Sequence, residues 1–425
     1  MKTLIAAVLG VFTACSGCGR SKPPDARSFV ESDPTGHCTR EGESPTSDRP
    51  NAVTERQYGE YTLAEWRDIL KDLDPQELGT DSAVPGLIDI VRDTKVPEFT
   101  RRQAAYTLGC IGAAARDAVP ILIEVLDQAN EELEPSRIWA IKALALFGPE
   151  AQPAARKLIQ ILQDECACVT ERIAVLEPLT AIGTAHPNII PSVAELLNVQ
   201  TDDRSNLSAA ERTRLCRVAA ESLGLIGPHA ASTIPVLIRS AQAADEGLRQ
   251  KSVTALGAMK SRGNIAIPSL ADIILVDSSA VVRDAAAEAL ANVGISSIPA
   301  FEQLLQDADA EVRWRAAAGL GKIGRAAKTS SVALQKALQD ESSLVRINVA
   351  EAIWKISSDA EMVVPVLVQE LTNEDRQIRI QSIRLLASIE PSAKIALTYL
   401  EKLLKDDREY VRKTAAQALK KITAM

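Results

Sequence analysis

Aromatic residues make up only 3% of this 425-residue chain, and Lys and Arg do not outnumber Asp and Glu. Ala, Leu, Ile and Val therefore supply most of the 46% hydrophobic content. That composition favours thin helices packed closely on small residues over one thick core built on large rings. A general nucleic-acid-binding protein carries a basic surplus, whereas this chain has a net charge of −8 with both signs mixed. We therefore expect no nucleic-acid partner.

Motifs that carry catalytic or metal chemistry are also missing. The sequence has no Gly-rich phosphate loop and no nucleophile motif. Cys166 and Cys168 form a Cys-x-Cys pair, but no second pair or nearby His completes a zinc set at the usual spacing. A disulfide between residues two apart would be strained. We expect no metal site, no cofactor and no enzymatic activity.

The chain does contain one helical pattern repeated ten times. An Arg-like position is followed seven residues later by Leu or Ile and ten residues later by another apolar residue. The repeats start 30 to 36 residues apart, except for one gap of 44. Self-similarity at this period predicts an all-α fold, an α-α superhelix (solenoid) of about ten two-helix repeats. The starting positions are Arg101, Arg137, Arg172, Cys216, Arg249, Arg283, Arg313, Arg346, Arg379 and Arg412.

Proline and glycine mark the ends of the predicted helices. An apolar–Pro pair such as Ile267-Pro268 is expected to open the first helix of seven repeats, because proline suits a first helical turn. Glycine follows the second helix of six repeats, as at Gly294 and Gly324, and predicts a left-handed stop.

An acidic residue often lies six positions before the repeated arginine. In the C-terminal half these residues are Asp277, Asp307, Asp340 and Asp406, which precede Arg283, Arg313, Arg346 and Arg412; Asn373 precedes Arg379. Such an Asp can cap a helix or pair with an arginine of its own or the next repeat. The row could instead be a basic ligand-binding ladder. We favour a structural ladder, because a functional arginine would not need to recur in every unit.

These marks resemble HEAT repeats, in particular the short HEAT-like repeats of the phycobilisome-lyase type. Proline in the first helix, Asp in the turn and Val-Arg opening the second helix carry the resemblance, most clearly around Val282-Arg283 and Val312-Arg313. The resemblance covers about residues 60 to 425, with residues 61–78 as an N-terminal capping helix. It implies that the second helices line the concave side and that the protein binds other proteins.

The same resemblance raises two enzymatic alternatives. Deoxyhypusine hydroxylase is a HEAT-like enzyme that holds iron with His-Glu pairs, but His37, His186 and His229 are not followed by Glu. Phycobilin lyases share the repeat type, although the resemblance supplies no matching catalytic residue. An accessory protein of the phycobilisome-lyase type stays open as the alternative function.

Binding residues are expected on the second helices, one, two, five and eight residues after the repeated arginine. Trp139, Trp314, Arg315 and Trp354 are the candidates, because exposed aromatics and arginine anchor many interfaces. Alternatively, each tryptophan covers small residues of the next repeat. The insertion at residues 199–214 is a second candidate binding edge or a tolerated surface loop.

The N-terminus is expected to be a targeting segment. Leu4 to Phe12 is an apolar run too short to span a bilayer, and small residues directly before Cys15 and Cys18 resemble a bacterial lipobox. We expect a signal peptide at 1–18 with lipidation of Cys15 or Cys18, a disordered polar tether at 19–57 and the solenoid at 58–425. An unlipidated secretory signal is the alternative.

The sequence thus predicts a monomeric scaffold for protein–protein interaction, lipid-anchored in the cell envelope on the extracytoplasmic (periplasmic) side. Its expected partners are a protein or peptide ligand and the membrane that holds the anchor. A structural envelope component held by homotypic stacking is a further alternative.

Overall fold

The computed structural model describes residues 56–72, 80–127, 134–201, 207–389 and 394–423. The signal segment, Cys15, Cys18 and all of the tether before residue 56 lie outside the described residues.

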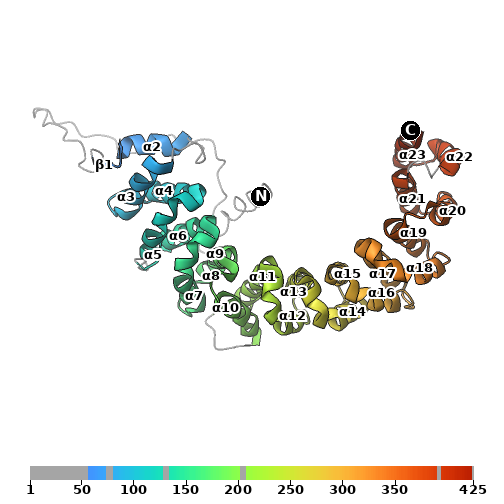
Figure 1. The fold of residues 1–425 in the computed structure, drawn as a ribbon, viewed down its shortest axis with the longest axis horizontal. Helices are drawn as coiled ribbons and strands as arrows, with labels where there is room; N and C mark the ends of the chain where they lie inside the picture. Colours follow the sequence, from blue (N-terminus) through green and yellow to red (C-terminus); the bar gives the residue numbers. More distant parts are fainter. Residues whose placement is uncertain (1–55, 73–79, 128–133, 202–206, 390–393, 424–425) are drawn as a thin grey trace, which may run out of the picture. The chain divides into compact units, whose positions relative to one another are not determined.

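Ten successive helix pairs make up the described chain, which confirms the predicted two-helix repeats (Figure 1). The first helices are α3 (Thr80–Arg92), α5 (Val119–Asp127), α7 (Ala155–Gln163), α10 (Ile189–Glu195), α12 (Ile234–Ser240), α14 (Ile267–Val276), α16 (Ile298–Leu304), α18 (Ser331–Ala337), α20 (Ala360–Glu370) and α22 (Leu397–Lys402). The second helices are α4 (Glu98–Ile111), α6 (Glu134–Phe147), α8 (Val169–Ala174) with α9 (Leu176–Ile182), α11 (Ala209–Ile226), α13 (Glu246–Ala258), α15 (Ala280–Val293), α17 (Ala310–Ile323), α19 (Ser343–Ser357), α21 (Arg376–Ile389) and α23 (Glu409–Thr423).

Short 3-10 helices connect or extend these pairs. They are η2 (Gly112–Ala118), η4 (Gly148–Ala154), η5 (Gly183–Ala185), η6 (Leu196–Thr201), η7 (Gly227–Thr233), η8 (Lys260–Ala266), η9 (Ile295–Ser297), η10 (Gly324–Ser330) and η12 (Leu403–Lys405).

The hydrophobic core runs through the repeats as one layer between first and second helices. The Leu or Ile seven residues after the repeated arginine is buried in nine of the ten repeats, as at Leu256 and Leu320. Leu419 in the tenth repeat is only partly buried.

An N-terminal cap covers the first repeat. The predicted helix at 61–78 is present as α2 (Leu63–Asp72), two residues later at its start, and residues 73–78 lie outside the described residues. The strands β1 (Gln57–Tyr58) and β2 (Tyr61–Thr62) pair antiparallel before it. The fully buried Trp66 donates its indole N–H to the Tyr58 carbonyl oxygen at 2.8 Å. Burial, with a hydrogen bond to Asp93, raises the pKa of Tyr58 to about 12. The hairpin thus ties the chain to the turn that follows α3.

Two predictions about helix ends need correction. Pro85 and Pro365 lie inside α3 and α20, which begin about a turn earlier than expected, whereas the prolines of α12, α14 and α16 stand in the first turn. Gly112 has φ 69° and ψ −130°, so it is not in the left-handed helical region. Side chains rarely adopt this positive-φ conformation, which explains why glycine is used there.

Neighbouring second helices pack through small residues. The residue that lies eight positions after the repeated arginine of one repeat contacts the residue that lies six positions after the arginine of the next repeat. A Cβ added to Gly257 would lie 2.6 Å from Ala289 Cα, and one added to Gly321 would lie 3.0 Å from Ala352 Cα. Gly109 against Ala143 and Gly224 against Ala255 repeat this contact. The expectation that position eight faces the binding surface is therefore wrong at these interfaces.

An Arg–Asp ladder follows the turns between first and second helices. Arg313 donates to Asp340 of the next repeat through Nε and Nη2 at 2.8 and 2.9 Å, and to the Asp307 carbonyl of its own turn at 2.9 Å. Asp340 also accepts the Ser342 N–H at 2.9 Å. Arg249–Asp277 has the same geometry, whereas Arg379 makes one hydrogen bond to Asp406, through Nη2 at 3.2 Å. Arg283 pairs with Glu311 and Arg346 with Glu370. Arg412 donates to the Asp406 carbonyl of its own turn.

The ladder changes where Cys216 replaces arginine. Cys216 Sγ contacts the Leu196 carbonyl at 3.2 Å, and burial raises the pKa of this thiol to about 11. Arg217, one residue later, forms the ion pair with Asp245 of the next repeat. This substitute arginine was not anticipated from the sequence.

The ladder predicts a pH-dependent stability. Burial is the largest influence on the pKa of Asp340 and raises it, but hydrogen bonds from Arg313 and the Ser342 N–H outweigh burial and leave the pKa below its usual value. A folded-state pKa that is lowered stabilises the fold above the unfolded value of about 3.9, and this stabilisation is lost as the pH falls through the folded value. Asp340→Asn keeps the turn but removes the charge, so it should lower the free energy of unfolding by about 1.5–3 kcal/mol at neutral pH.

Chemical denaturation at neutral and acidic pH measures this effect. The penalty of Asp340→Asn should shrink in acid, while Asp272→Asn, an exposed control, should change little. A penalty that is equally large in acid would contradict the role of the ion pair.

Candidate protein-binding surface

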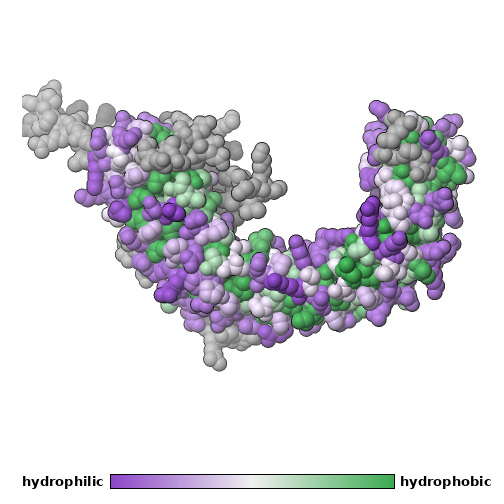
Figure 2. All heavy atoms as spheres, in the orientation of Figure 1, coloured by the Kyte–Doolittle hydropathy of each residue, from purple (hydrophilic) through white to green (hydrophobic). Residues whose placement is uncertain are grey.

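The exposed sides of the second helices form a continuous surface, here called the B face. Its most regular members lie five residues after the repeated arginine, for example Glu221, Glu288, Ala318 and Arg384, which are all exposed. Figure 2 shows a mixed surface with hydrophobic patches over α4 and α6 as well as over the segment from α14 to α17.

The four predicted anchors do not lie in equivalent environments. Trp139 is 5% exposed and Arg315 is 3% exposed, so the expected exposure is wrong for both. The Arg101 guanidinium lies 5.7 Å from the Trp139 ring, which therefore packs inside the repeat stack. Trp314 and Trp354 are only partly buried and pack against the core. Trp314 and Arg315 come together at one cavity, and Trp139 and Trp354 do not line it.

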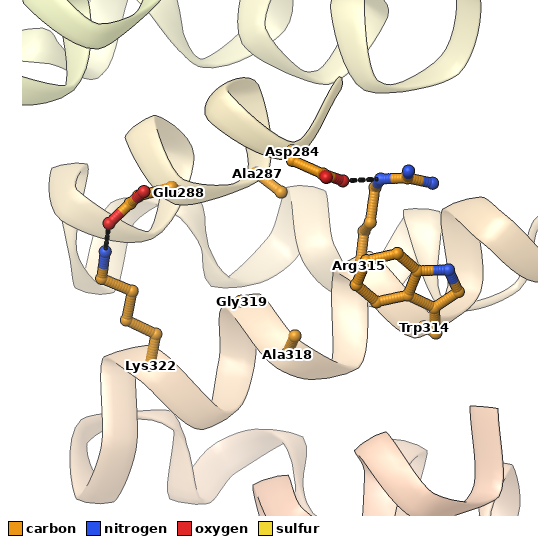
Figure 3. A pocket seen from close by; sticks show the side chains of 8 residues that line it. All are labelled: Asp284, Ala287, Glu288, Trp314, Arg315, Ala318, Gly319 and Lys322. Carbon is orange, nitrogen blue, oxygen red and sulfur yellow. Dashed lines mark hydrogen bonds and ion pairs between the residues drawn. The ribbon is translucent and has the colours of Figure 1, made fainter. Parts of the chain in front are cut away.

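This cavity of about 200 Å³ lies between α15 and α17 (Figure 3). We call it the α15–α17 pocket. Small residues form part of its lining and charged side chains flank them, with the Trp314 ring beside Arg315 at one end (Figure 3). Its lining residues are Asp284, Ala287, Glu288, Trp314, Arg315, Ala318, Gly319 and Lys322.

A paired change in the repeat accounts for the pocket. The residue two after the first-helix proline is Leu in five of the seven repeats with an apolar–Pro pair and Val193 in a sixth, but in α16 it is the fully buried Phe301. Six residues after the repeated arginine, this repeat has Gly319, whereas neighbouring repeats have Ala289 and Ala352. A Cβ added to Gly319 would lie 2.3 Å from the Phe301 ring. An aromatic ring therefore occupies the space beneath Gly319, where its neighbours pack helix against helix.

Ion pairs across the two helices hold the pocket's charged rim. Arg315 Nε donates to Asp284 Oδ1 at 2.6 Å, and Arg315 Nη1 donates to Glu311 at 3.2 Å. Lys322 pairs with Glu288 at the other end (Figure 3). The Arg315 guanidinium carbon lies 4.5 Å from the Trp314 ring centroid, within cation–π range. Hydrogen bonds from Arg283 and then Arg315 lower the pKa of Glu311.

The remaining sequence candidates lie elsewhere. Cys166 and Cys168 are exposed and form no disulfide, and the described residues contain no group of three or more His, Cys, Asp or Glu that could hold a metal ion. Part of the insertion, residues 202–206, lies outside the described residues. Its end forms the start of α11, where Ser208 and Glu211 make a capping box.

Sequence reasoning missed Asp284, Phe301 and Gly319. The sequence does contain a signal: residue 301 is Phe where most repeats have Leu, and residue 319 is Gly where neighbouring repeats have Ala. It required knowing that these two positions of the repeat touch.

Comparison with family models places the chain in a family. HEAT repeats match residues 204–291, 298–363 and 364–424, more than half of the sequence. The PBS lyase HEAT-like repeat matches residues 100–128 and 282–307. The protein belongs to the HEAT-repeat family, which confirms the resemblance found in the sequence. No curated protein matches the chain significantly.

Solved structures show the same fold. The karyopherin Kap121p bound to the extreme C-terminus of the protein phosphatase Cdc14p aligns with a TM-score of 0.55 at 14% identity, over 84% of this chain and 43% of the other. The Kap95:Nup1 complex aligns with a TM-score of 0.55 at 12% identity, over 86% and 56%. The chain thus spans about half the length of these karyopherins. At such identities the likeness concerns the fold alone.

Within the ranges that the structure describes, no helix has the length and apolar character needed to cross a bilayer.

The origin of the pocket can be tested with a double-mutant cycle. Gly319→Ala alone should lower the free energy of unfolding by about 1–3 kcal/mol, because the new methyl group overlaps Phe301. Adding Phe301→Leu restores the residues of the neighbouring repeats and should recover stability, with a coupling energy of about 0.5–3 kcal/mol. Urea denaturation measures all four proteins. Additive effects would show that the two residues do not share one space.

Proposed function

We propose that this protein is a lipid-anchored, extracytoplasmic HEAT-repeat scaffold that binds a protein partner through its B face. The α15–α17 pocket receives one apolar or aromatic side chain of that partner. The observation that carries the proposal is the paired change at Phe301 and Gly319, which coincides with looser packing of α15 on α17 and a cavity beside Trp314.

The lining of the pocket favours a peptide side chain as its occupant. Ala287, Ala318 and Gly319 offer apolar contact, and Trp314 offers a ring of the kind that anchors interfaces. A cavity of about 200 Å³ is smaller than the 300–1,000 Å³ usual for small-molecule sites. One large side chain therefore suits it better than a whole substrate.

The charges of the pocket favour binding over catalysis. Asp284 is paired with Arg315, and Glu288 is paired with Lys322. General acid–base work needs a group that is poised to give or take a proton. Paired charges instead hold the rim in place and can turn towards the polar backbone of a bound chain.

Two further observations support a protein ligand and an anchor. Kap121p is bound to the C-terminus of a phosphatase and Kap95 forms a complex with Nup1, so this repeat architecture accommodates protein ligands in those proteins. The apolar run from Leu4 to Phe12, followed by small residues before Cys15, suits export and lipidation.

Binding through the pocket can be tested by affinity capture of the full-length, membrane-extracted protein with quantitative mass spectrometry. Trp314→Ala and the pocket-closing pair Phe301→Leu with Gly319→Ala should each reduce recovery of the recurrent partner about tenfold or more, because a buried anchor is worth at least 2 kcal/mol. Tyr399→Ala, an exposed aromatic on α22, is the matched control and should retain the partner. Equal recovery by all variants would place the binding site elsewhere.

Lipidation can be tested by mass analysis of the mature N-terminus. We expect a diacylglyceryl mass on Cys15, and Cys15→Ala should move the protein out of the detergent phase while Cys18→Ala leaves it there. The reverse pattern would assign the anchor to Cys18. An intact Met1 on a protein that fractionates with cytosol would contradict both the anchor and the location.

A further inference from the structure

Cations on the B face are balanced along the middle of the chain. From α11 to α17, three positive side chains of the B face pair with acids of the preceding second helix. Lys251 Nζ lies 2.7 Å from Glu221 Oε1, and the Arg315–Asp284 and Lys322–Glu288 pairs follow the same rule. This part of the B face therefore offers little net charge to a partner.

The balance fails at the last two second helices, α21 and α23. Within the described part of the chain, Arg376 and Arg384 form no ion pair. Arg408 pairs only with its sequence neighbour Asp407, at 3.3 Å, and its side chain is 62% exposed. Residues 376–425 contain eleven Lys and Arg against five Asp and Glu, although the whole chain carries −8. The cationic surplus is therefore local.

Two of these arginines line a cavity of about 160 Å³ between α21 and α23, here called the α21–α23 pocket. Ile380 and Val411 are buried and give it an apolar side. The Tyr410 ring is 56% exposed. The lining residues are Arg376, Gln377, Ile380, Arg408, Tyr410 and Val411.

Hydrogen bonds fix the pocket's rim and engage the nearby acids. Arg384 Nη2 donates to the Tyr410 hydroxyl at 2.6 Å, which orients the phenol. Asp375 is engaged as the acceptor of the Gln377 N–H at 2.8 Å. Glu409 pairs with Lys413 at 2.7 Å. These neighbouring carboxylates are thus held elsewhere, and none of them is recorded against Arg376 or Arg384.

We propose that the α21–α23 pocket binds an acidic segment of the partner protein. A carboxylate side chain lies between the Arg376 and Arg408 guanidinium groups, and its methylene stem packs on Ile380, Val411 and Tyr410. Guanidinium forks match carboxylates with paired hydrogen bonds, and clustered arginines recognise acidic motifs. The apolar side of the pocket favours a side chain with a stem over a free inorganic anion.

This inference rests on the proposed function, because it assumes a protein partner on the B face, but it concerns a different pair of helices. It implies that the partner carries negative charge as well as an apolar side chain. The ligand should combine an apolar or aromatic residue with an acidic stretch.

Fluorescence anisotropy with a short fluorescein-labelled peptide of alternating Glu and Ala tests the proposal. The full chain is used with Cys15→Ala and Cys18→Ala in every arm, so that no lipid anchor interferes. The variant Arg376→Gln, Arg384→Gln, Arg408→Gln should weaken binding about tenfold or more, since charge-assisted hydrogen bonds are the strong ones. The control Arg116→Gln, Arg156→Gln, Arg325→Gln removes the same charge from exposed arginines elsewhere and should bind as the parent does.

Each further outcome bears on the proposal. A matched peptide of Gln and Ala should bind about tenfold more weakly, and added salt should weaken the Glu peptide. Equal binding of the two peptides, or equal loss in both triple variants, would overturn the inference. Binding to phosphatidylglycerol vesicles that is lost in the triple variant, without binding of the Glu peptide, would instead assign the surface to lipid. The pocket-closing pair at residues 301 and 319 should bind the Glu peptide normally, so failure here is separable from failure of the α15–α17 pocket.

Discussion

The close approach of neighbouring second helices is the contact on which the rest of the structure depends. Where a glycine eight residues after one arginine faces an alanine six residues after the next, as at Gly257 and Ala289, no larger side chain fits between the helices. The chain can therefore stack on small residues with few aromatics. Because each repeat touches only its neighbours, the spacing of one helix pair can change without disturbing distant repeats.

That local freedom explains where the candidate sites lie. Phe301 beneath Gly319 is a compensated exchange of volume that keeps the core filled. The core loses no packing, and the surface gains a cavity. A binding site in such a fold thus arises from a departure from the repeat, and the regular positions serve the stack.

The sequence predicted the architecture well and the site poorly, for one physical reason. Helix periodicity and the buried leucine row, including Leu320, depend on contacts inside one repeat, which a single unit displays. Exposure on the B face depends on contacts between repeats. Trp139 and Arg315 looked exposed by their position on one helix, yet the neighbouring repeat covers them. Arg217 was missed for the same reason, because its partner Asp245 belongs to the next unit.

The arrangement of charge follows from the same nearest-neighbour rule. On the B face between α11 and α17, Lys251, Arg315 and Lys322 pair with acids of the preceding second helix. The ladder arginines pair instead with acids of the following repeat, as Arg313 does with Asp340. The balance of charge therefore depends on what each unit supplies to its neighbours. Among the described residues, Arg376 and Arg384 of α21 form no ion pair, and Arg408 before α23 pairs only with the neighbouring Asp407, so these cations stay available to a ligand. Packing between repeats determines where a cavity forms on the B face, and unpaired charge determines which kind of ligand group that cavity can bind. A partner that binds both the α15–α17 pocket and the α21–α23 pocket would have to place an apolar side chain at one helix pair and a carboxylate at the other. This double requirement gives the scaffold specificity without any single deep site.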